Sequence, residues 1–308
     1  MHDLFTFGEV MALFLASDTD SVINAKEFAR EVAGAEANVS VGLTRLGLRV
    51  KYLSKVGADE LGDAVLTSFE SEGVDTSLIL RSQSFTGILI RNRGTTRPVH
   101  VTYVRKESAG SELCAADISE EFISESRWVH VTGISAAISR TGAEAVKKAL
   151  SLAVKFEKPR SLDLNIRRKL WSEKEAQESL LLLAPLATHI FGGVDEYEVV
   201  WGKKEPLKNL ESALECGARV AIMTSGDGLI RVLSADGYME SMPPRISAVD
   251  PVGSGDAFVA GTISALIAGL SLENAVAQGA RCGAGAASKV GDWAGLPYGR
   301  AGVINADA

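Results

Sequence analysis

Residues 250–256, DPVGSGD, place the carboxylate of Asp256 directly behind two glycines at the start of an apolar segment. Glycine loses more backbone entropy on folding than any other residue, so a run of this kind needs a specific reason. Consecutive amides at positions 253–256 can point into one concavity, and at a helix start they add to the positive end of its dipole. Such a loop suits a phosphoryl group in transfer, and Asp256 beside it can accept the proton of an attacking hydroxyl. The catalytic set expected on this basis is Gly253, Ser254, Gly255 and Asp256.

Three other interpretations of residues 250–256 compete with this one. A dinucleotide fingerprint requires Gly-x-Gly-x-x-Gly early in a strand–turn–helix unit, and the third glycine is absent here. A triphosphate loop requires Gly-x4-Gly-Lys-Ser/Thr, and neither Gly-Lys-Ser nor Gly-Lys-Thr occurs in the sequence. A plain strand-to-helix turn explains Pro251 and one glycine but explains Asp256 poorly, because a capping carboxylate precedes the first helical turn.

The elements that must position this loop follow an alternating pattern. Short strand-like runs alternate with helical patterns along most of the 308 residues, which predicts a mostly parallel sheet between helices. One of these helices is expected to begin after Asp59 as its cap and to stop at Gly73. Between about residues 84 and 105 the pattern becomes two alternating strands around a Gly-Thr-Thr turn. We interpret residues 1–308 as one α/β domain that carries a small β flap.

The composition bears on partners and location. The formal net charge of −7 argues against nucleic acid or an anionic membrane as the main partner. No uncharged apolar stretch approaches about 20 residues and no basic leader is visible, so we expect no membrane span and a cytoplasmic location. The three cysteines and four histidines are dispersed, which speaks against a structural zinc site and fits a reducing compartment.

The sequence resembles the ribokinase-like, or PfkB, carbohydrate kinases along nearly its whole length. The segment AVDPVGSGDAFVAG is similar to the C-terminal signature of that family, and AGAEANVSVGLTRLG is similar to its N-terminal signature. The segments VGADELGDAV, EGVDTSLI, DLNIRRKLW and GAASKVGDWAGLP fall in the expected order. The resemblance implies a ribokinase-like α/β fold, with a central, mostly parallel sheet between helices and a small β lid over the sugar. The lid strands would lie at about residues 10–16, 28–33 and 84–105.

Within this family, the details resemble the 2-keto-3-deoxygluconate kinases. Glu36 in GAEAN, the lid segment TYVRKESAGS and the segment SLDLNIRRKLWS are similar to the motifs of that subgroup. Independently, Tyr103 and Arg105 share one face of a strand, and Arg167 follows a buried strand end, where α/β sites open. Two guanidinium groups at one small site favour a carboxylated sugar, whereas the competing interpretation of each arginine is a surface ion pair.

The resemblance implies roles for the remaining site residues, together with ATP and Mg²⁺, a small sugar or sugar acid as substrate, and a homo-oligomer formed through the lid. Competing interpretations are a helix cap for Asn38, plain core for Ile134, and tight helix packing for residues 283–287. A cation such as K⁺ would lie on the backbone oxygens of Asp250 and Val252. The expected sugar-binding set is Gly34, Asn38, Tyr103, Arg105, Ile134 and Arg167. The expected nucleotide set is Gly283, Ala284, Ala287, Ser225, Gly226, Gly228, and Glu196 in a magnesium–water role.

Several positions depart from the family pattern. Ala33 replaces the first glycine of a usual Gly-Gly pair, and Gly193 replaces the asparagine of an Asn-x-x-Glu segment. Met223 and Ser225 stand where relatives often carry a polar residue and a glycine, and Leu89 stands where a lid tyrosine often contacts the keto acid. Two other functions therefore stay open: a fructokinase- or ribokinase-like sugar kinase, and a catalytically silent sugar-acid sensor on the same fold.

Overall fold

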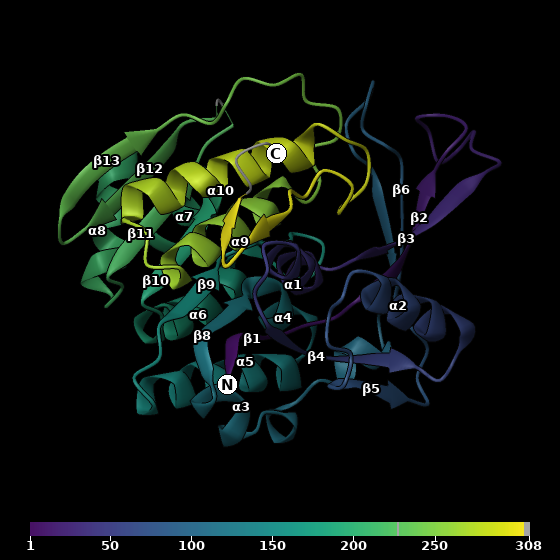
Figure 1. The fold of residues 1–308 in the computed structure, drawn as a ribbon, viewed down its shortest axis with the longest axis horizontal. Helices are drawn as coiled ribbons and strands as arrows, with labels where there is room; N and C mark the ends of the chain where they lie inside the picture. The colour runs from purple at the N-terminus through teal and green to yellow at the C-terminus, as the bar shows by residue number, and fades with distance from the viewer. Residues whose placement is uncertain (227, 305–308) are drawn as a thin grey trace. The chain divides into compact units, whose positions relative to one another are not determined.

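The computed structural model describes residues 1–226 and 228–304, and its ribbon is shown in Figure 1. The contacts divide the chain into two compact units, each of which is described by itself below. The first unit comprises residues 1–7 and 114–243, and the second comprises residues 8–113 and 244–308. The interpretation of residues 1–308 as a single kinase domain therefore stays a prediction.

Within the first unit, the strands follow the order β13-β12-β11-β10-β9-β8-β1. Neighbours from β1 to β11 pair in parallel, whereas β12 and β13 extend the edge of β11 as an antiparallel pair. Strands β8 and β10 are buried along most of their length, as expected for parallel strands covered on both faces. The strands are β1 His2–Phe7, β8 Ser126–Thr132, β9 Arg160–Asp163, β10 His189–Gly193, β11 Val220–Thr224, β12 Ile230–Ser234 and β13 Gly237–Ser241.

Most helices of the first unit begin at a serine or threonine cap. The hydroxyl of Ser139 accepts a hydrogen bond from the amide of Gly142 at 3.0 Å and so caps the helix that begins at Arg140. The hydroxyl of Thr132 accepts from the amide of Ile134 at 3.1 Å and caps a short helix directly after the strand that ends at Thr132. The helices are α3 Glu120–Ser124, α4 Gly133–Ile138, α5 Arg140–Lys155, α6 Glu173–Leu183, α7 Val194–Trp201 and α8 Pro206–Glu215, with 3₁₀ turns η2 Ala115–Asp117 and η3 Ala184–Leu186.

A separate four-stranded sheet in the second unit has the order β3-β2-β6-β7 and is called the lid sheet below. Its strands contribute a buried hydrophobic cluster, which consists of Met11, Leu13, Leu15, Ala33 and Leu89. Its strands fall within the residues expected for a lid, but the connection between β6 and β7 is longer than the expected Gly-Thr-Thr turn. The strands are β2 Met11–Ala16, β3 Phe28–Ala33, β6 Ile88–Arg91 and β7 Val101–Val104.

Helices α9 and α10 lie side by side in the second unit, as the two long yellow-green helices of Figure 1 show. Their axes approach closely because Gly261 faces Cys282 and leaves no room for a β-carbon. Among the described residues, no helix has the length and apolarity needed to cross a membrane. The remaining elements of this unit are α1 Ala35–Arg45, β4 Val50–Gly57, α2 Glu60–Ser71, β5 Ile79–Ser82, η1 Ala109–Glu112, α9 Ser254–Ile267, α10 Leu272–Ala287, β14 Gly299–Arg300 and β15 Val303–Ile304.

Candidate active site

The loop before α9 has the geometry of an anion site. Gly253 is the N-cap of α9 with a φ of 78°, and a β-carbon there would lie 3.0 Å from the carbonyl oxygen of Asp292. A β-carbon added to Gly255 would meet no described atom within 4 Å, so the space beside its backbone is open. The amides of the first turn have no acceptor within the helix. The hydroxyl and the amide of Ser254 both donate back to the carbonyl of Pro251, at 2.7 Å and 3.3 Å, which leaves the amides of Gly253 and Gly255 as the groups for a ligand.

Asp256 lies in the first turn of α9 and is 8% exposed. Its Oδ2 accepts a hydrogen bond of 2.7 Å from Nδ2 of Asn38, which also donates to Oδ2 of Asp292 at 3.3 Å. The Asn38 Oδ1 accepts from the indole nitrogen of Trp293 at 2.8 Å, and this contact fixes the orientation of the amide. Asn38 therefore orients the carboxylate of Asp256. Its predicted contact with sugar hydroxyls stays a prediction, and the competing interpretation as a helix cap is wrong because Gly34 is the N-cap of α1.

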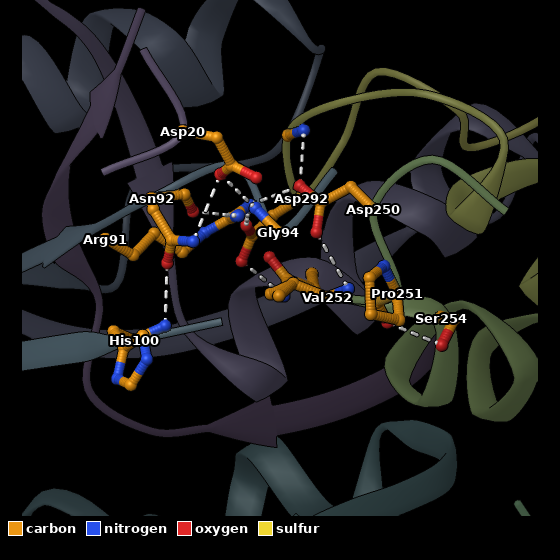
Figure 2. Close-up of polar contacts among 12 residues, drawn as sticks. Asp20, Arg91, Asn92, Gly94, His100, Asp250, Pro251, Val252, Ser254 and Asp292 are labelled. Atoms are coloured by element: carbon orange, nitrogen blue, oxygen red, sulfur yellow. Dashed lines mark hydrogen bonds and ion pairs between the residues drawn. The ribbon is translucent and has the colours of Figure 1, made fainter. Parts of the chain in front are cut away.

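A buried ion-pair cluster adjoins the anion loop, and no sequence motif indicates it (Figure 2). The guanidinium of Arg91 contacts the carboxylates of Asp250 at 2.8 Å and Asp292 at 3.0 Å. Burial raises the pKa of Asp292, and the charge of Arg91 acts in the opposite direction. Asp250 was expected to bind a monovalent cation through its backbone oxygen. Its side chain is already occupied by Arg91 and by the amides of Val252 and Gly291, each at 3.1 Å.

The expected sugar-binding residues of the second unit lie around the lid sheet and α1. Tyr103 pairs with Leu89 across β6 and β7 and packs on the buried cluster of the lid sheet. Arg105 follows β7, is 8% exposed, and binds the buried carboxylate of Glu9 through Nε at 2.7 Å. The guanidinium of Arg105 also lies 5.1 Å from the ring centre of Tyr103. Arg105 is therefore held rigidly by protein groups, and its contact with a substrate carboxylate stays a prediction.

A cavity of about 470 Å³ opens in the first unit at the carboxyl ends of β10 and β11. Ligands of parallel α/β sheets bind at this edge, and the volume is typical of small-molecule sites. Two of the expected nucleotide residues, Ser225 and Gly226, line it, and Gly228 closes the same turn by donating to the Ser225 carbonyl at 2.9 Å. Asp227 lies outside the described residues. The lining residues are Gly193, Val194, Asp195, Glu198, Thr224, Ser225 and Gly226.

Glu196 stands at the start of α7, and its carboxylate is bound by backbone amides. Oε1 accepts from Ile166 at 2.7 Å, and Oε2 accepts from Gly193 at 2.8 Å. Burial raises the pKa of Glu196, against the opposing effects of these amides and of the charge on Arg167. The side chain thus joins the loop after β9 to the start of α7. Its expected magnesium–water role stays a prediction, and no group of three or more potential metal ligands occurs in the described part of the chain.

The loop after β9 contains a residue that the expected site did not include. Asn165 has a φ of 36°, which is uncommon for a residue other than glycine, and its Oδ1 is buried without a hydrogen-bond partner among the described residues. Such a combination marks functional loops, and the family-like segment DLNIRRKLW was the available signal. Arg167 in the same loop is exposed, and Ile134 is the second residue of α4.

The expected adenine wall on α10 mainly serves helix packing. A β-carbon on Gly283 would lie 3.0 Å from the carbonyl oxygen of Ser254, so this glycine admits the start of α9. The carbonyl of Ala287 accepts the amides of Val249 and Asp250 and so fixes the segment that leads into the anion loop. Ala284 is half-buried. A contact between these residues and a nucleotide stays a prediction.

Comparisons with known proteins identify the family. A family model described as "pfkB family carbohydrate kinase" matches residues 1–297. The chain belongs to the pfkB family of carbohydrate kinases. It is 36% identical over 301 residues to a 2-dehydro-3-deoxygluconokinase of Bacillus subtilis (strain 168), covering 96% of this chain and 92% of that protein.

Solved structures of pfkB proteins agree with the family assignment. A PfkB protein from Polaromonas sp. JS666 superposes with a TM-score of 0.88 and 32% identity, covering 97% of this chain and 98% of that one. A 2-dehydro-3-deoxygluconokinase from Thermotoga maritima superposes with a TM-score of 0.88 and 26% identity, covering 95% of both chains. The expected ribokinase-like α/β fold and the expected sugar-kinase activity of the pfkB family are thereby confirmed.

Proposed function

We propose that the protein transfers a phosphoryl group from ATP to the terminal hydroxyl of 2-keto-3-deoxygluconate and so forms the 6-phosphate. The observation that carries this proposal is the carboxylate of Asp256, which is oriented by Asn38 at 2.7 Å and lies in the first turn of α9, behind the left-handed N-cap Gly253. The choice of sugar acid is supported by the 2-dehydro-3-deoxygluconokinases of Bacillus subtilis and Thermotoga maritima, whose name denotes the same keto acid.

In this proposal, Asp256 is the general base. As the sugar oxygen forms its bond to the γ-phosphorus, the bond from that phosphorus to the β,γ-bridging oxygen of ATP breaks, and the hydroxyl proton passes to Asp256. The amides at residues 253–255 stabilise the charge on the phosphoryl oxygens, which is the main contribution a protein makes to this reaction. Asn38 keeps the carboxylate of Asp256 in place by donating to it.

We assign nucleotide binding to the cavity at the ends of β10 and β11, because its lining combines backbone groups with the hydroxyls of Thr224 and Ser225. These groups suit phosphate and ribose oxygens. Mg²⁺ bound with the nucleotide would neutralise part of the phosphate charge. Glu196 and Asp195 are the carboxylates of this region that could orient its water ligands, and the first of them is held rigidly by two amides.

The proposal of a monovalent cation such as K⁺ concerns the backbone oxygens of Asp250 and Val252. The carboxylate of Asp250 is fully buried and binds the guanidinium of Arg91, but this contact engages the side chain and not the backbone oxygens. We expect higher turnover in potassium salts than in tetramethylammonium salts. Equal turnover in the two would remove the cation from the proposal.

We further propose that two copies of the chain associate through the lid sheet. Phe28 on β3 is 38% exposed and Val104 on β7 is 45% exposed, so apolar side chains of both outer strands face solvent. Light scattering of the purified protein and of a Val104→Lys variant checks this. A monomeric wild type would contradict it.

The experiment that tests the proposed function is a phosphoryl-transfer screen. The purified protein is supplied with ATP and Mg²⁺ and with 2-keto-3-deoxygluconate, gluconate, fructose or ribose, and the release of ADP and the position of the new phosphate are measured. We expect the highest catalytic efficiency, kcat/KM, for the keto acid 2-keto-3-deoxygluconate and a phosphate on its terminal carbon. A higher kcat/KM for fructose or ribose would mean that this neutral sugar, and not the keto acid, is the substrate. If the protein binds sugars but phosphorylates none of them, the result would favour a sensor.

A further inference from the structure

The interior of the second unit holds an arginine that the proposed chemistry does not use. Arg91 ends β6 and is 1% exposed, although a buried guanidinium is costly unless it is paired. Its Nη2 lies 2.8 Å from Oδ2 of Asp250 and 3.0 Å from Oδ1 of Asp292. Figure 2 shows this guanidinium between the two carboxylates. One side chain of the lid sheet thus holds two acidic residues from the C-terminal part of the chain.

The first of these carboxylates holds the start of the anion loop. Oδ1 of Asp250 accepts the amide of Val252 at 3.1 Å, which fixes the turn directly before the Gly253 cap of α9. Oδ2 accepts the amide of Gly291 at 3.1 Å and so ties the loop to the segment after α10. The positions of the amides at 253–255 therefore depend on a carboxylate whose charge is balanced by Arg91.

The second carboxylate leads to the proposed base. Asp292 accepts from Arg91 through Oδ1 and from Asn38 through Oδ2. The same amide nitrogen of Asn38 donates to Asp256 at 2.7 Å. Arg91 is therefore connected to Asp256 by a continuous path of side-chain contacts, all within the second unit.

The backbone that carries Arg91 is itself fixed. Oδ1 of Asp20 accepts from the amide of Gly94 at 2.9 Å and from Nδ2 of Asn92 at 3.1 Å, and Oδ2 accepts from the amide of Thr96 at 2.6 Å. The Nη1 atom of Arg91 donates to the carbonyl of Asn92 at 3.1 Å. The guanidinium is thus presented by a rigid turn, which suits a positioning role better than a mobile surface charge would.

We propose that Arg91 is a positioning residue for phosphoryl transfer, a built-in cation that holds the anion loop through Asp250 and the base Asp256 through Asp292 and Asn38. The inference rests on the proposed function for its reaction, but the contacts themselves do not. If Arg91 served folding alone, its loss would lower stability and leave the turnover of each folded molecule unchanged. If it positions the loop and the base, its loss lowers kcat more than it changes the KM for the sugar.

The test compares Arg91→Gln, Arg91→Lys and a control, Lys51→Gln, under saturating ATP and Mg²⁺. Lys51 is the control because it also forms an ion pair in the second unit, with Asp75 at 2.6 Å, and its side chain is 19% exposed. We expect Arg91→Gln to lose kcat by about 10²-fold with the KM for the sugar changed by less than about threefold. Arg91→Lys, which keeps the charge, should recover about tenfold of that loss. Lys51→Gln should keep its kcat per folded molecule.

A second measurement does not depend on turnover. Hydrogen exchange of the backbone amides of residues 250–256 should be about tenfold faster in Arg91→Gln than in the wild type, and unchanged in Lys51→Gln. If Arg91→Gln does not fold, Asp292→Asn replaces it, since this change removes the charge that links Arg91 to Asn38, and its kcat should fall by about tenfold.

The outcomes separate the positioning role of Arg91 from the proposed kinase function. Arg91→Gln with wild-type kcat and wild-type exchange would overturn the positioning role, as would a loss of kcat no larger than that of Lys51→Gln. If Arg91→Gln does not fold, a wild-type kcat in Asp292→Asn would overturn the positioning role. If the wild type phosphorylates no sugar, the proposed function fails, and the exchange of residues 250–256 alone decides whether Arg91 holds the loop.

Discussion

At the scale of single residues, the site depends on which partner each charged group already has. Arg105 is bound to the buried Glu9, so removing it would also leave a carboxylate buried without its counterion. Arg168 is exposed and forms ion pairs with Glu173 at 2.9 Å and Asp195 at 3.4 Å. Arg167 is exposed beside it, which makes it the better residue for testing whether the substrate carries a carboxylate.

We predict that Arg167→Ala raises the KM for the sugar acid by about 10²-fold, because a charge-assisted contact with the substrate carboxylate is lost. The matched control is Arg168→Ala, which removes a neighbouring exposed charge and should change this KM by less than about twofold. Steady-state kinetics with the sugar acid and with a neutral sugar measure both. Equal KM values for the two variants would remove Arg167 from substrate binding.

The residues of the anion loop could be predicted because they form one contiguous segment of the sequence. Gly253, Gly255 and Asp256 are neighbours, and the chemistry of a helix start follows from their order alone. Arg91 could not be found in this way, since its partner Asp250 lies 159 residues away. The Glu9 partner of Arg105 lies 96 residues away. A sequence pattern shows that a charge exists, whereas only the fold shows which group neutralises it.

At the scale of elements, the site depends on how helix α9 begins. Gly253 adopts a left-handed conformation that other residues enter at a cost of about 1–2 kcal/mol. A β-carbon at this position would also lie 3.0 Å from the carbonyl oxygen of Asp292, so both the turn and the neighbouring loop require glycine. Gly255, by contrast, has an ordinary helical backbone with open space beside it. The two glycines therefore have different functions.

We predict different effects for alanine at these two glycines. Gly253→Ala should lower stability by about 1–2 kcal/mol and kcat by about 10²-fold, because the amides of the loop are displaced. Gly255→Ala should keep the wild-type stability and lower kcat and phosphate affinity through the added methyl group. Urea unfolding and steady-state kinetics distinguish the two. A normal kcat in both variants would mean that the amides do not bind the phosphoryl group.

Elements with strong local signals could be predicted, and elements that depend on the neighbouring chain could not. Asp59 caps α2 as predicted, with its carboxylate 2.7 Å from the amide of Gly62. The short helix α4 has no such signal, because Val131–Thr132–Gly133–Ile134 has the composition of a strand end, whereas the hydroxyl of Thr132 caps a helix there. Strand β13 has only a weak local signal, because Gly237–Ser241 is largely exposed and is defined by its pairing with β12.

At the scale of the whole molecule, the alternation of strands and helices was enough to predict the fold class. The division into two units was not predictable, because the chain crosses from one unit to the other near residues 7 and 113 without a linker-like composition, and the Pro-Pro dipeptide at residues 243–244 indicates only a local break. Stability at this scale includes buried groups that serve no catalytic purpose. Burial lowers the pKa of His130 to about 3, and burial with nearby arginines lowers the pKa of His189 to about 4.

We predict a loss of stability in weak acid from these two histidines. Their folded pKa values lie below the usual value of 6.5, so the unfolded chain binds more protons in this range, and the stabilisation is full above pH 6.5 and lost as the pH falls. Between pH 7 and 5, each should lower the free energy of unfolding by about 2 kcal/mol. Urea unfolding of the wild type and of His130→Asn at both values checks this. An unchanged pH difference in the variant would contradict it.

The proposed reaction depends most directly on Asp256 as the proton acceptor, and Asp256→Asn tests this with a near-isosteric change. The measurement is kcat with ATP and the sugar acid 2-keto-3-deoxygluconate, together with the dissociation constant of the sugar acid from calorimetry. The account predicts that kcat falls by about 10²- to 10⁴-fold while the dissociation constant changes by less than about threefold. A variant that turns over like the wild type would contradict it.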